Sequence, residues 1–592
     1  MMLISNKKKV DYIGFWILVA FLIFIFTLVA LFVGRNLDLE QKTSIQVSFE
    51  MPVPTFSHSS GFYNKEFLLS MSCKNPSAKI YFTLDGSTPT IHSFQYFKPF
   101  LVKDRTDEPN KLSEIKTAPV FKYPLYNVFK GVIIRAIAVV NDSVSSKDVS
   151  ASFFVHSKGR NRYSLPVISL ITDPDNIFGY KSGIYVMGST ADDKDYYLRN
   201  SLRIDNYKRG FPANYKRRGK NWYRPVALTF FDVDTNKGFA TQAKVGIHGN
   251  ASREQQHKSL KIIVESSGHV NDLIFPVFDK VRPDTISSFL LRSSSQDRYS
   301  TMFRDAILQN IFKGVVSLDI QDYRPLILFF NGEYWGIHNL RNRYDEFYFV
   351  HKYAIPADRV SVIGVKSNLG IEGELTMDQQ LGRVIMGTEG DHKPYHDLLR
   401  YIKRHDLNHE THYAYVSQRM DVDNFIDYLL AEMYVVNLDW PHSNMQMWRY
   451  KVPIANNQFK FNKDGRWRWM LMDLDNGFLK GRYSYNMVEH VLRSHQLGPL
   501  FSSLLKNKLF RDKFFARADF HLATTFEVNR VLKKINRAQT QIAPEIKEHI
   551  ERWRTHNSLE AWVSEVSSFK EFAQKRPIYF KEELKQLKSL YK

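Results

Sequence analysis

The stretch from Tyr12 to Val33 is the feature that most constrains this chain, because it carries no charged residue over 22 positions. At about 1.5 Å per residue, a helix of this length crosses the roughly 30 Å hydrocarbon layer of a membrane. A cleaved signal peptide is the alternative, but its apolar core would be about 7–15 residues and would end at a small-x-small site. The sequence shows no such site, so we expect an uncleaved transmembrane anchor at residues 12–34.

The charges that flank this segment predict its orientation. Lys7, Lys8 and Lys9 precede it, whereas the stretch that follows, RNLDLEQK, mixes both signs. By the positive-inside rule, residues 1–11 are expected in the cytoplasm. We therefore expect a single-pass protein of the cell membrane, held by one N-terminal helix, with its later domains extracytoplasmic.

The composition indicates an ordered protein of several domains. A chain of 592 residues with 44% hydrophobic residues is long enough for two or three packed cores. Its net charge of +21 attracts anionic partners at long range, but the basic residues are spread out and no nucleic-acid-binding motif is present. The single cysteine, Cys73, excludes an intramolecular disulfide. No nucleic-acid partner is expected.

A linker at 35–46 is followed by a β-rich region at 47–156, whose short strands and frequent turns predict an immunoglobulin-like β-sandwich. Within it, KIYFTLDGSTPT is followed by a strand that ends in Arg135 and Ala136. This pattern resembles the C-terminal domain of chitobiases and β-hexosaminidases. The resemblance implies a spacer or accessory module, with sugar binding as the alternative.

The chemistry is expected in residues 157–498, which mix strands and helices, and not in the helical C-terminal region, 499–592. Here an amphipathic helix, DVDNFIDYLLAEMYVVN, runs into the loop LDWPHSN, in which Pro441 breaks the helix and Asp439 stands five residues before Asn444. A β-hairpin follows and ends at Asp473 and Asp475. The order is helix, D-x-x-x-x-N loop, hairpin and D-x-D segment.

This order suits phosphoryl transfer, in which an acceptor hydroxyl must be oriented and a metal ion must be held against phosphates. Asp439 is the candidate for the hydroxyl, and the oxygens of Asn444, Asp473 and Asp475 suit Mg²⁺ or Mn²⁺. A cation for the phosphates is also expected. The upstream stretch HGNASREQQHKSLKI supplies the candidates Arg253, Lys258 and Lys261.

Several blocks of this region look like the spore-coat protein H (CotH) kinase family. They are HGNASR with HKSLKI, SFLLRSSSQD with FRDAI, YRPLILFFNGEYWGIHNLRNRYDE, NLDWPHSNMQMWR and RWRWMLMDLDNGF. The resemblance implies that Asp439 is the catalytic Asp, Asn444 a metal ligand, Asp473 the metal-binding Asp with Asp475 close behind, and Lys258 the phosphate-binding Lys.

The resemblance also implies a fold and an activity. The expected fold class is α+β, with the transmembrane helix, the immunoglobulin-like sandwich, an atypical kinase-like α+β domain and a helical C-terminal cap. The expected activity transfers phosphate from ATP, with Mg²⁺ or Mn²⁺, to a hydroxyl of a protein or surface polymer of the cell envelope.

Two departures leave a catalytically weak pseudokinase open. Asn342 stands where relatives often have a Glu that could pair with a lysine, and His338 stands where a Tyr is common. Asp345 or Glu346 are candidates to replace that Glu.

Two further alternatives remain. The D-x-D of MDLD would also suit a metal-dependent glycosyltransferase, but the preceding half lacks regular βαβ repetition. A scaffold or adhesin would use the tryptophans only as core residues, and would leave three acidic residues and an Asn at adjacent loop ends without a purpose.

Overall fold

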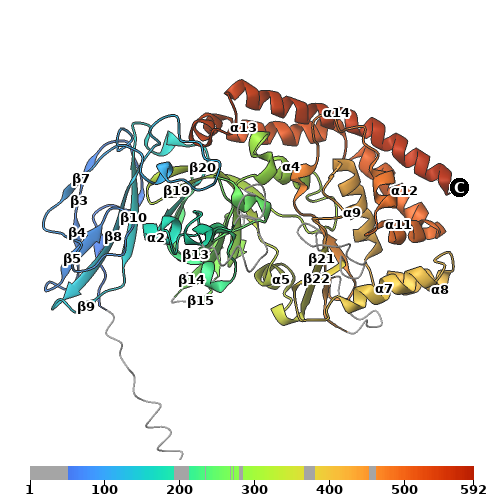
Figure 1. Ribbon diagram of the computed structural model, residues 1–592, viewed down its shortest axis with the longest axis horizontal. Helices are drawn as coiled ribbons and strands as arrows, with labels where there is room; N and C mark the ends of the chain where they lie inside the picture. The colour runs from blue at the N-terminus through green and yellow to red at the C-terminus, as the bar shows by residue number, and fades with distance from the viewer. Residues whose placement is uncertain are drawn as a thin grey trace, which may run out of the picture.

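The computed structural model describes residues 51–192, 212–233, 235, 237–266, 269–270, 272–278, 284–365, 381–452 and 462–591. Figure 1 shows a β-rich N-terminal domain at one end, a β-barrel in the middle, and a mainly helical part at the other end. Residues 12–34, where the sequence predicts a transmembrane helix, lie outside the described residues. Among the described residues, no helix is long and apolar enough to cross a membrane.

The N-terminal domain has one six-stranded sheet and two short strand pairs. The sheet has the order β2–β10–β8–β5–β6, with β9 on β8. Its strands are β2 (Gly61–Tyr63), β5 (Lys79–Thr83), β6 (Phe94–Gln95), β8 (Val132–Val140), β9 (Val144–Ser145) and β10 (Val149–Val155). The pairs are β1 (Thr55–Phe56) with β4 (Met71–Ser72), and β3 (Phe67–Leu69) with β7 (Phe100–Val102).

The two faces of this sheet pack against different apolar neighbours. On one face Ile134 and Phe153 form a core with Leu69 of the strand pairs. On the other face the ring of Phe154 lies 4.5 Å from that of Phe329 in the barrel. Successive side chains of a strand point to opposite faces, so β10 joins both cores through adjacent residues.

The middle part is a closed seven-stranded barrel. The strands follow one another in the order β13–β12–β11–β19–β20–β18–β14, and β14 pairs back with β13, while β15 (His269–Val270) pairs antiparallel with the end of β14. Only β11 and β19 run parallel. The strands are β11 (Val167–Ile171), β12 (Arg224–Phe231), β13 (Gly238–Ile247), β14 (Leu260–Ser266), β18 (Ser288–Arg292), β19 (Tyr323–Phe330) and β20 (Glu333–Asn342).

Apolar side chains that alternate along the strands fill the interior of this barrel. Leu260 and Ile262 of β14 pack inside with Leu291 of β18. The long helix α13 (Val528–Trp553) lies along β20, where Trp553 donates a hydrogen bond from Nε1 to the carbonyl of Trp335 at 3.0 Å. Two short elements, α2 (Pro174–Phe178) and the strand pair β16 (Leu273–Phe275) with β17 (Asp284–Ile286), flank the barrel.

The third part packs helices around a four-stranded sheet of order β22–β21–β23–β24. Helix α9 is buried at every residue except Asp423 and forms its centre. The strands are β21 (Val360–Val365), β22 (Leu381–Met386), β23 (Gln446–Tyr450) and β24 (Arg468–Met470). The helices are α4 (Arg304–Asn310), α5 (Glu346–Tyr353), α7 (Lys393–Arg404), α8 (Glu410–Ser417), α9 (Val422–Val435), α10 (Met487–Arg493), α11 (Gly498–Leu505), α12 (Lys508–Ala523) and α14 (Leu559–Leu590).

The fold class predicted from the sequence is corrected by these findings. The described part of the chain has a β-rich N-terminal half and a helical C-terminal part, and it contains no helix that could cross a membrane. The sequence predicted a kinase-like α+β domain and gave no indication of a barrel, whereas the pairing of β13 with β14 closes one. Strand closure depends on pairing between segments, which the periodicity of single strands does not encode.

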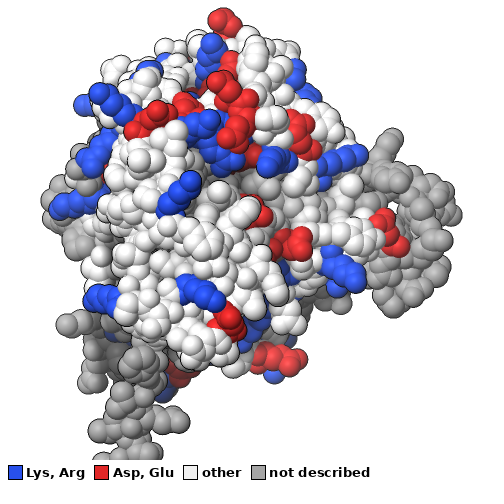
Figure 2. Space-filling model, turned by 90° about the vertical axis from the view of Figure 1, so that its left-hand side faces the viewer, with Lys and Arg blue, Asp and Glu red and all other residues white. Residues whose placement is uncertain are grey.

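Figure 2 shows the molecule from the end that carries the N-terminal domain, and on this face the charged side chains gather mainly in the upper part. The strand pair of β3 and β7 exposes Leu68 and Leu101, and β6 of the sheet exposes Phe94.

Candidate active site

The loop after α9 carries the first predicted site residue, Asp439. Helix α9 ends at Val435, and the next residue, Val436, adopts a left-handed conformation, so the chain turns away from the helix there. The loop is fastened back onto α9 because Trp440 donates a hydrogen bond from Nε1 to Oη of Tyr428 at 2.7 Å. The carbonyl of Trp440 also lies 2.8 Å from Nε2 of His490 on α10. The loop that presents Asp439 is thus held from two helices.

Asp439 itself is partly exposed and points toward the segment after the hairpin. Its Oδ2 accepts a hydrogen bond from Nδ2 of Asn476. Its backbone carbonyl accepts one from the amide of Ser443 at 2.9 Å, which closes the loop. A carboxylate in this position accepts hydrogen bonds only, so it is suited to orient an acceptor hydroxyl and to receive its proton.

The hairpin of β23 and β24 brings the two ends of the predicted motif together. Gln446 pairs with Met470 in this antiparallel ladder, so the residue before β23 and the residue after β24 lie at the same end. Asn444 consequently donates a hydrogen bond from Nδ2 to the backbone carbonyl of Asp473 at 3.4 Å. Both residues have positive φ angles, 56° for Asn444 and 54° for Asp473. The structure therefore brings Asp439, Asn444 and Asp473 to one place.

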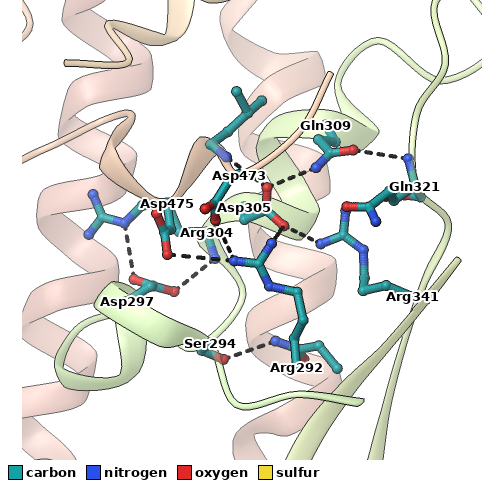
Figure 3. Close-up of polar contacts among 12 residues, drawn as sticks. Arg292, Ser294, Asp297, Arg304, Asp305, Gln309, Gln321, Arg341, Asp473 and Asp475 are labelled. Carbon is teal, nitrogen blue, oxygen red and sulfur yellow. Dashed lines mark hydrogen bonds and ion pairs between the residues drawn. The ribbon is translucent and has the colours of Figure 1, made fainter. Parts of the chain in front are cut away.

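Arg292, at the end of β18, lies between the two carboxylates of the D-x-D segment (Figure 3). Its Nη2 is 2.6 Å from Oδ1 of Asp473 and 3.6 Å from Oδ2 of Asp475. Asp475 lies in the short helix η9 (Leu474–Asn476) and is buried. Burial and the neighbouring carboxylate of Asp473 raise the pKa of Asp475 well above its ordinary value. Asp473 and Asp475 therefore share one cation, the guanidinium group of Arg292.

A third carboxylate, Asp305 of α4, contacts both Arg292 and the segment that carries Asp475. It forms ion pairs with Arg341 and with Nη1 of Arg292 at 3.3 Å, and it accepts a hydrogen bond from the amide of Leu474 at 2.8 Å. Although burial opposes the effect, the guanidinium groups of Arg341 and Arg292 hold the pKa of Asp305 below its ordinary value. Asp305 therefore stays ionised and fixes both Arg292 and η9.

The oxygen atoms of these residues are suitable ligands for a divalent cation, although the carboxylates do not surround an open centre. Asp473 and Asp475 already share one positive charge on Arg292, and Asn444 adds a carboxamide oxygen at the same end of the hairpin. Mg²⁺ and Mn²⁺ prefer oxygen ligands of this kind. No group of three or more His, Cys, Asp or Glu among the described residues has the arrangement of a metal site.

Two of the predicted phosphate-binding residues are engaged elsewhere. Lys258 is fully buried, and its Nζ donates to the carbonyls of Arg253 at 2.8 Å and Gln255 at 2.6 Å while lying 3.9 Å from the ring centre of Tyr215. Burial lowers the pKa of Lys258 well below its ordinary value. Arg253 likewise donates to four backbone carbonyls, among them that of Ile247. The structure does not bring Lys258 and Arg253 to Asp473.

Lys261 faces a different environment, on the outer face of the barrel. It pairs with Leu290, so it lies on the same face of the sheet as Arg292, two residues further along β18. Burial and the charge of Arg343 lower the pKa of Lys261 to about 8, while the carboxylates of Asp345 and Glu346 oppose the shift. Lys261 therefore stands between basic and acidic neighbours on the side of the barrel that carries Arg292.

His248 is a neighbour of these residues that the sequence did not point to. It follows β13, and its amide donates to the carbonyl of Ser259 at 2.8 Å, so it lies beside β14 on the same outer face as Lys261. Burial, followed by the charges of Arg292 and Arg343, lowers the pKa of His248 to about 3. We call the group His248, Lys261, Arg292 and Arg343 the basic face. Alternation of side chains along β14 and β18 was the signal that could have identified it.

The comparison with family models decides what kind of protein this is. Residues 245–580, more than half of the chain, match the model of the family described as CotH kinase protein. The chain belongs to the CotH kinase protein family. The resemblance noted in the sequence is thereby confirmed at the level of the family, and it supports an atypical kinase-like protein. The match continues through α13 and into α14, so the C-terminal helices fall within the CotH region.

The N-terminal domain has a match of its own. Residues 69–153 match the model described as Fn3 associated. The likeness to chitobiase C-terminal domains stays a prediction. A comparison with curated proteins finds no match.

Proposed function

We propose that this CotH protein is an atypical kinase that transfers the γ-phosphate of ATP to a hydroxyl of a protein or surface polymer. The observation that carries the proposal is the meeting of Asp439, Asn444 and Asp473 at one end of the hairpin, next to Arg292 of the basic face. Phosphoryl transfer needs a base, a metal-binding acid and positive charge for the phosphates in one place. Membership of the CotH family supports the same reaction class.

The roles follow from the contacts. The hydrogen bond from Asn476 falls on Oδ2 of Asp439, so Oδ1 is the oxygen proposed to take the proton of the acceptor hydroxyl. The acceptor oxygen then forms the new bond to the γ-phosphorus, and the bond from that phosphorus to the ADP oxygen breaks. Asp473, Asp475 and Asn444 would hold Mg²⁺ or Mn²⁺, which supplies charge neutralisation at the phosphate oxygens.

The basic face is proposed to hold the phosphates in place of Lys258. Lys261 and Arg343 lie on the same outer side of the barrel as Arg292, whereas Lys258 is occupied by backbone carbonyls. Asp345 and Glu346 act on Lys261 electrostatically, although Asp345 itself forms an ion pair with Arg343 at 2.7 Å. Asn342 instead accepts a hydrogen bond from the amide of Asp322 through Oδ1.

The proposal is tested by transfer of labelled phosphate from ATP by the purified protein, with Mg²⁺ or Mn²⁺. Asp439→Asn should lower the transfer rate at least about 100-fold, since it removes the base but keeps the shape of the side chain. Asp397→Asn, on the exposed side of α7, is the control and should leave the rate unchanged. Full transfer by the Asp439→Asn protein would refute the proposed role.

A pseudokinase is the second candidate, and the ion pair between Arg292 and Asp473 favours it. An arginine that already neutralises the metal-binding acid reduces the gain from binding a metal ion. This candidate predicts that ATP binds, seen as a rise in the melting temperature, while no label is transferred to any acceptor. Metal-dependent transfer excludes it.

A further inference from the structure

A cavity of about 570 Å³ lies between the N-terminal domain and α13, away from the residues of the proposed kinase site. Its walls include Asp104, Tyr126 and Phe129 from the N-terminal domain, and Glu548 and Arg552 from α13. The volume is in the range of about 300–1,000 Å³ that is typical of small-molecule sites. We call it the interdomain cavity.

Arg552 is an unpaired buried cation in the wall of this cavity. Its side chain is 2% exposed, and none of its three guanidinium nitrogens has a hydrogen-bond partner among the residues that the structure describes. The guanidinium carbon lies 3.9 Å from the ring centre of Trp553 and 4.7 Å from that of Trp335. Aromatic faces stabilise a cation but accept no conventional hydrogen bonds, so five N–H donors remain unsatisfied.

The same cavity contains an arginine with an ion-pair partner for comparison. Arg162 forms an ion pair with Glu548 at 2.8 Å and lies over the ring of Tyr163 at 4.3 Å. Buried charges without such a partner are costly, which is why they are rarely left alone. Burial lowers the pKa of Arg552 to about 10, so it stays charged at neutral pH. Arg552 thus has the surroundings of a binding residue without the partner.

The lining of the cavity restricts what that partner is. Four carboxylates, Asp104, Asp107, Glu548 and Glu551, face three cations, Arg162, Lys547 and Arg552. Because carboxylates exceed cations, the lining opposes each negative charge that a ligand brings. A monoanion meets the least repulsion among anions, and its one charge can pair with the fork of Arg552. Carboxylate acceptors favour a ligand that carries hydroxyl donors. The exposed ring of Tyr126 offers a flat apolar face.

We infer that the interdomain cavity binds a hydroxylated monocarboxylate of the acidic-sugar class, with its carboxylate on Arg552 and its hydroxyls on the cavity's acidic residues. Such a ligand would contact the N-terminal domain and α13 together. The inference does not rest on kinase activity, because the cavity shares no residue with the proposed kinase site.

The test uses the full chain and the intrinsic fluorescence of its tryptophans, because Arg552 lies against Trp335 and Trp553. Glucuronate, glucose, acetate and inorganic phosphate are titrated separately, and calorimetry checks each curve. Glucuronate is expected to bind saturably. Glucose and acetate are each expected to bind at least about tenfold more weakly, because glucose lacks the carboxylate and acetate lacks the hydroxyls. Phosphate is expected to bind more weakly than glucuronate.

Two variants test the geometry. Arg552→Met keeps the length of the side chain and removes an unpaired charge, so the protein should remain folded while glucuronate binding falls at least about tenfold. Tyr126→Ala changes an exposed residue and should weaken binding severalfold without affecting folding. Asp439→Asn should bind glucuronate as the unchanged protein does.

Three results would overturn the inference. They are the absence of saturable glucuronate binding, tighter binding of phosphate than of glucuronate, and unchanged glucuronate affinity in the Arg552→Met protein. If Arg552→Met does not fold, unchanged affinity in Tyr126→Ala overturns it instead.

Discussion

Arg292 donates a hydrogen bond from Nη2 to Oδ1 of Asp473 at 2.6 Å, and this contact joins the barrel to the loop that follows the hairpin. Although burial opposes the effect, the carboxylates of Asp473, Asp305 and Asp475 raise the pKa of Arg292 above its ordinary value. The guanidinium therefore occupies the position of a cation among three acids. A metal ion at Asp473 and Asp475 must share these acids with Arg292 or displace it.

This relationship predicts how metal affects stability. Replacing Arg292 with Met leaves Asp473 and Asp475 without their cation, so unfolding should become easier by about 2–4 kcal/mol in the absence of metal. Millimolar Mg²⁺ or Mn²⁺ should then raise the melting temperature of Arg292→Met more than that of the unchanged protein. Thermal unfolding with and without metal measures both effects.

Arg341→Met is the matched control for that measurement. It also removes a buried arginine from Asp305, but Arg341 makes no ion pair with Asp473 or Asp475. The Arg341→Met protein should be destabilised as well, and metal should not restore it. An equal response to metal in the two variants would contradict the placement of the cation site.

The hydrogen bond that holds the Asp439 loop on α9 gives a second prediction. Tyr428→Phe removes the acceptor for Nε1 of Trp440, and the buried donor left behind should cost about 1–3 kcal/mol. Because the loop presents Asp439, kcat for phosphate transfer should fall severalfold while KM for ATP changes little. Steady-state kinetics with varied ATP separates the two constants.

Tyr395→Phe serves as the comparison, because Tyr395 is buried and its hydroxyl has no hydrogen-bond partner in the described part of the chain. Removing that hydroxyl should leave both stability and kcat unchanged. The role of the loop contact is excluded if the two phenylalanine variants behave alike.

A cluster of buried histidines predicts the response to acid. His257 lies 4.3 Å from His338 and 5.2 Å from His549, measured between ring centres, where α13 covers the barrel. Burial lowers the pKa of His338 to about 4, below its ordinary 6.5. The unfolded chain therefore binds a proton near pH 6.5 that the folded chain does not bind until about pH 4.

The sign of the effect follows from this difference. The contribution of His338 to stability is complete above about pH 6.5 and is lost as the pH falls toward 4, by roughly 3 kcal/mol in all. Urea unfolding at pH 7, 6 and 5 should show this loss, and it should be smaller for His338→Gln, which has no group that titrates. Equal pH slopes for the two proteins would contradict the buried neutral state of His338.

The sequence predicted the acidic half of the site because its residues are close along the chain. The break at Pro441 and the hairpin after it place Asn444 beside Asp473 by local geometry alone. The basic half depends on strand pairing across the barrel, where Lys261 faces Leu290 and Arg292 follows. Motif order favoured Lys258, but this residue precedes β14 and its buried Nζ donates to the backbone carbonyls of Arg253 and Gln255.

Closure of the barrel could not be predicted from the sequence for the same reason. The alternating pattern of β13 and β14 identifies each as a strand, but their mutual pairing joins the two ends of the sheet and is set by packing of the whole core. The amphipathic C-terminal helices were predicted as helices. Their contacts with α9 were not, because apolar spacing does not identify the partner surface.

Those contacts give the last prediction, which concerns the C-terminal helix α14. Arg576 is fully buried, forms an ion pair with Glu583, and donates to the carbonyls of Met433 and Tyr434 at the end of α9, just before the Asp439 loop. Arg576→Met would leave Glu583 as an unpaired buried charge, so we expect a loss of about 3–5 kcal/mol in the free energy of unfolding. Its neighbour Lys575 pairs with Glu571 on the surface, and Lys575→Met should cost less than about 0.5 kcal/mol. Denaturant unfolding of the two variants compares them directly. A helix that only caps the domain would give two small and similar values, whereas a large value for Arg576 alone means that α14 stabilises the end of α9 and the loop that carries Asp439.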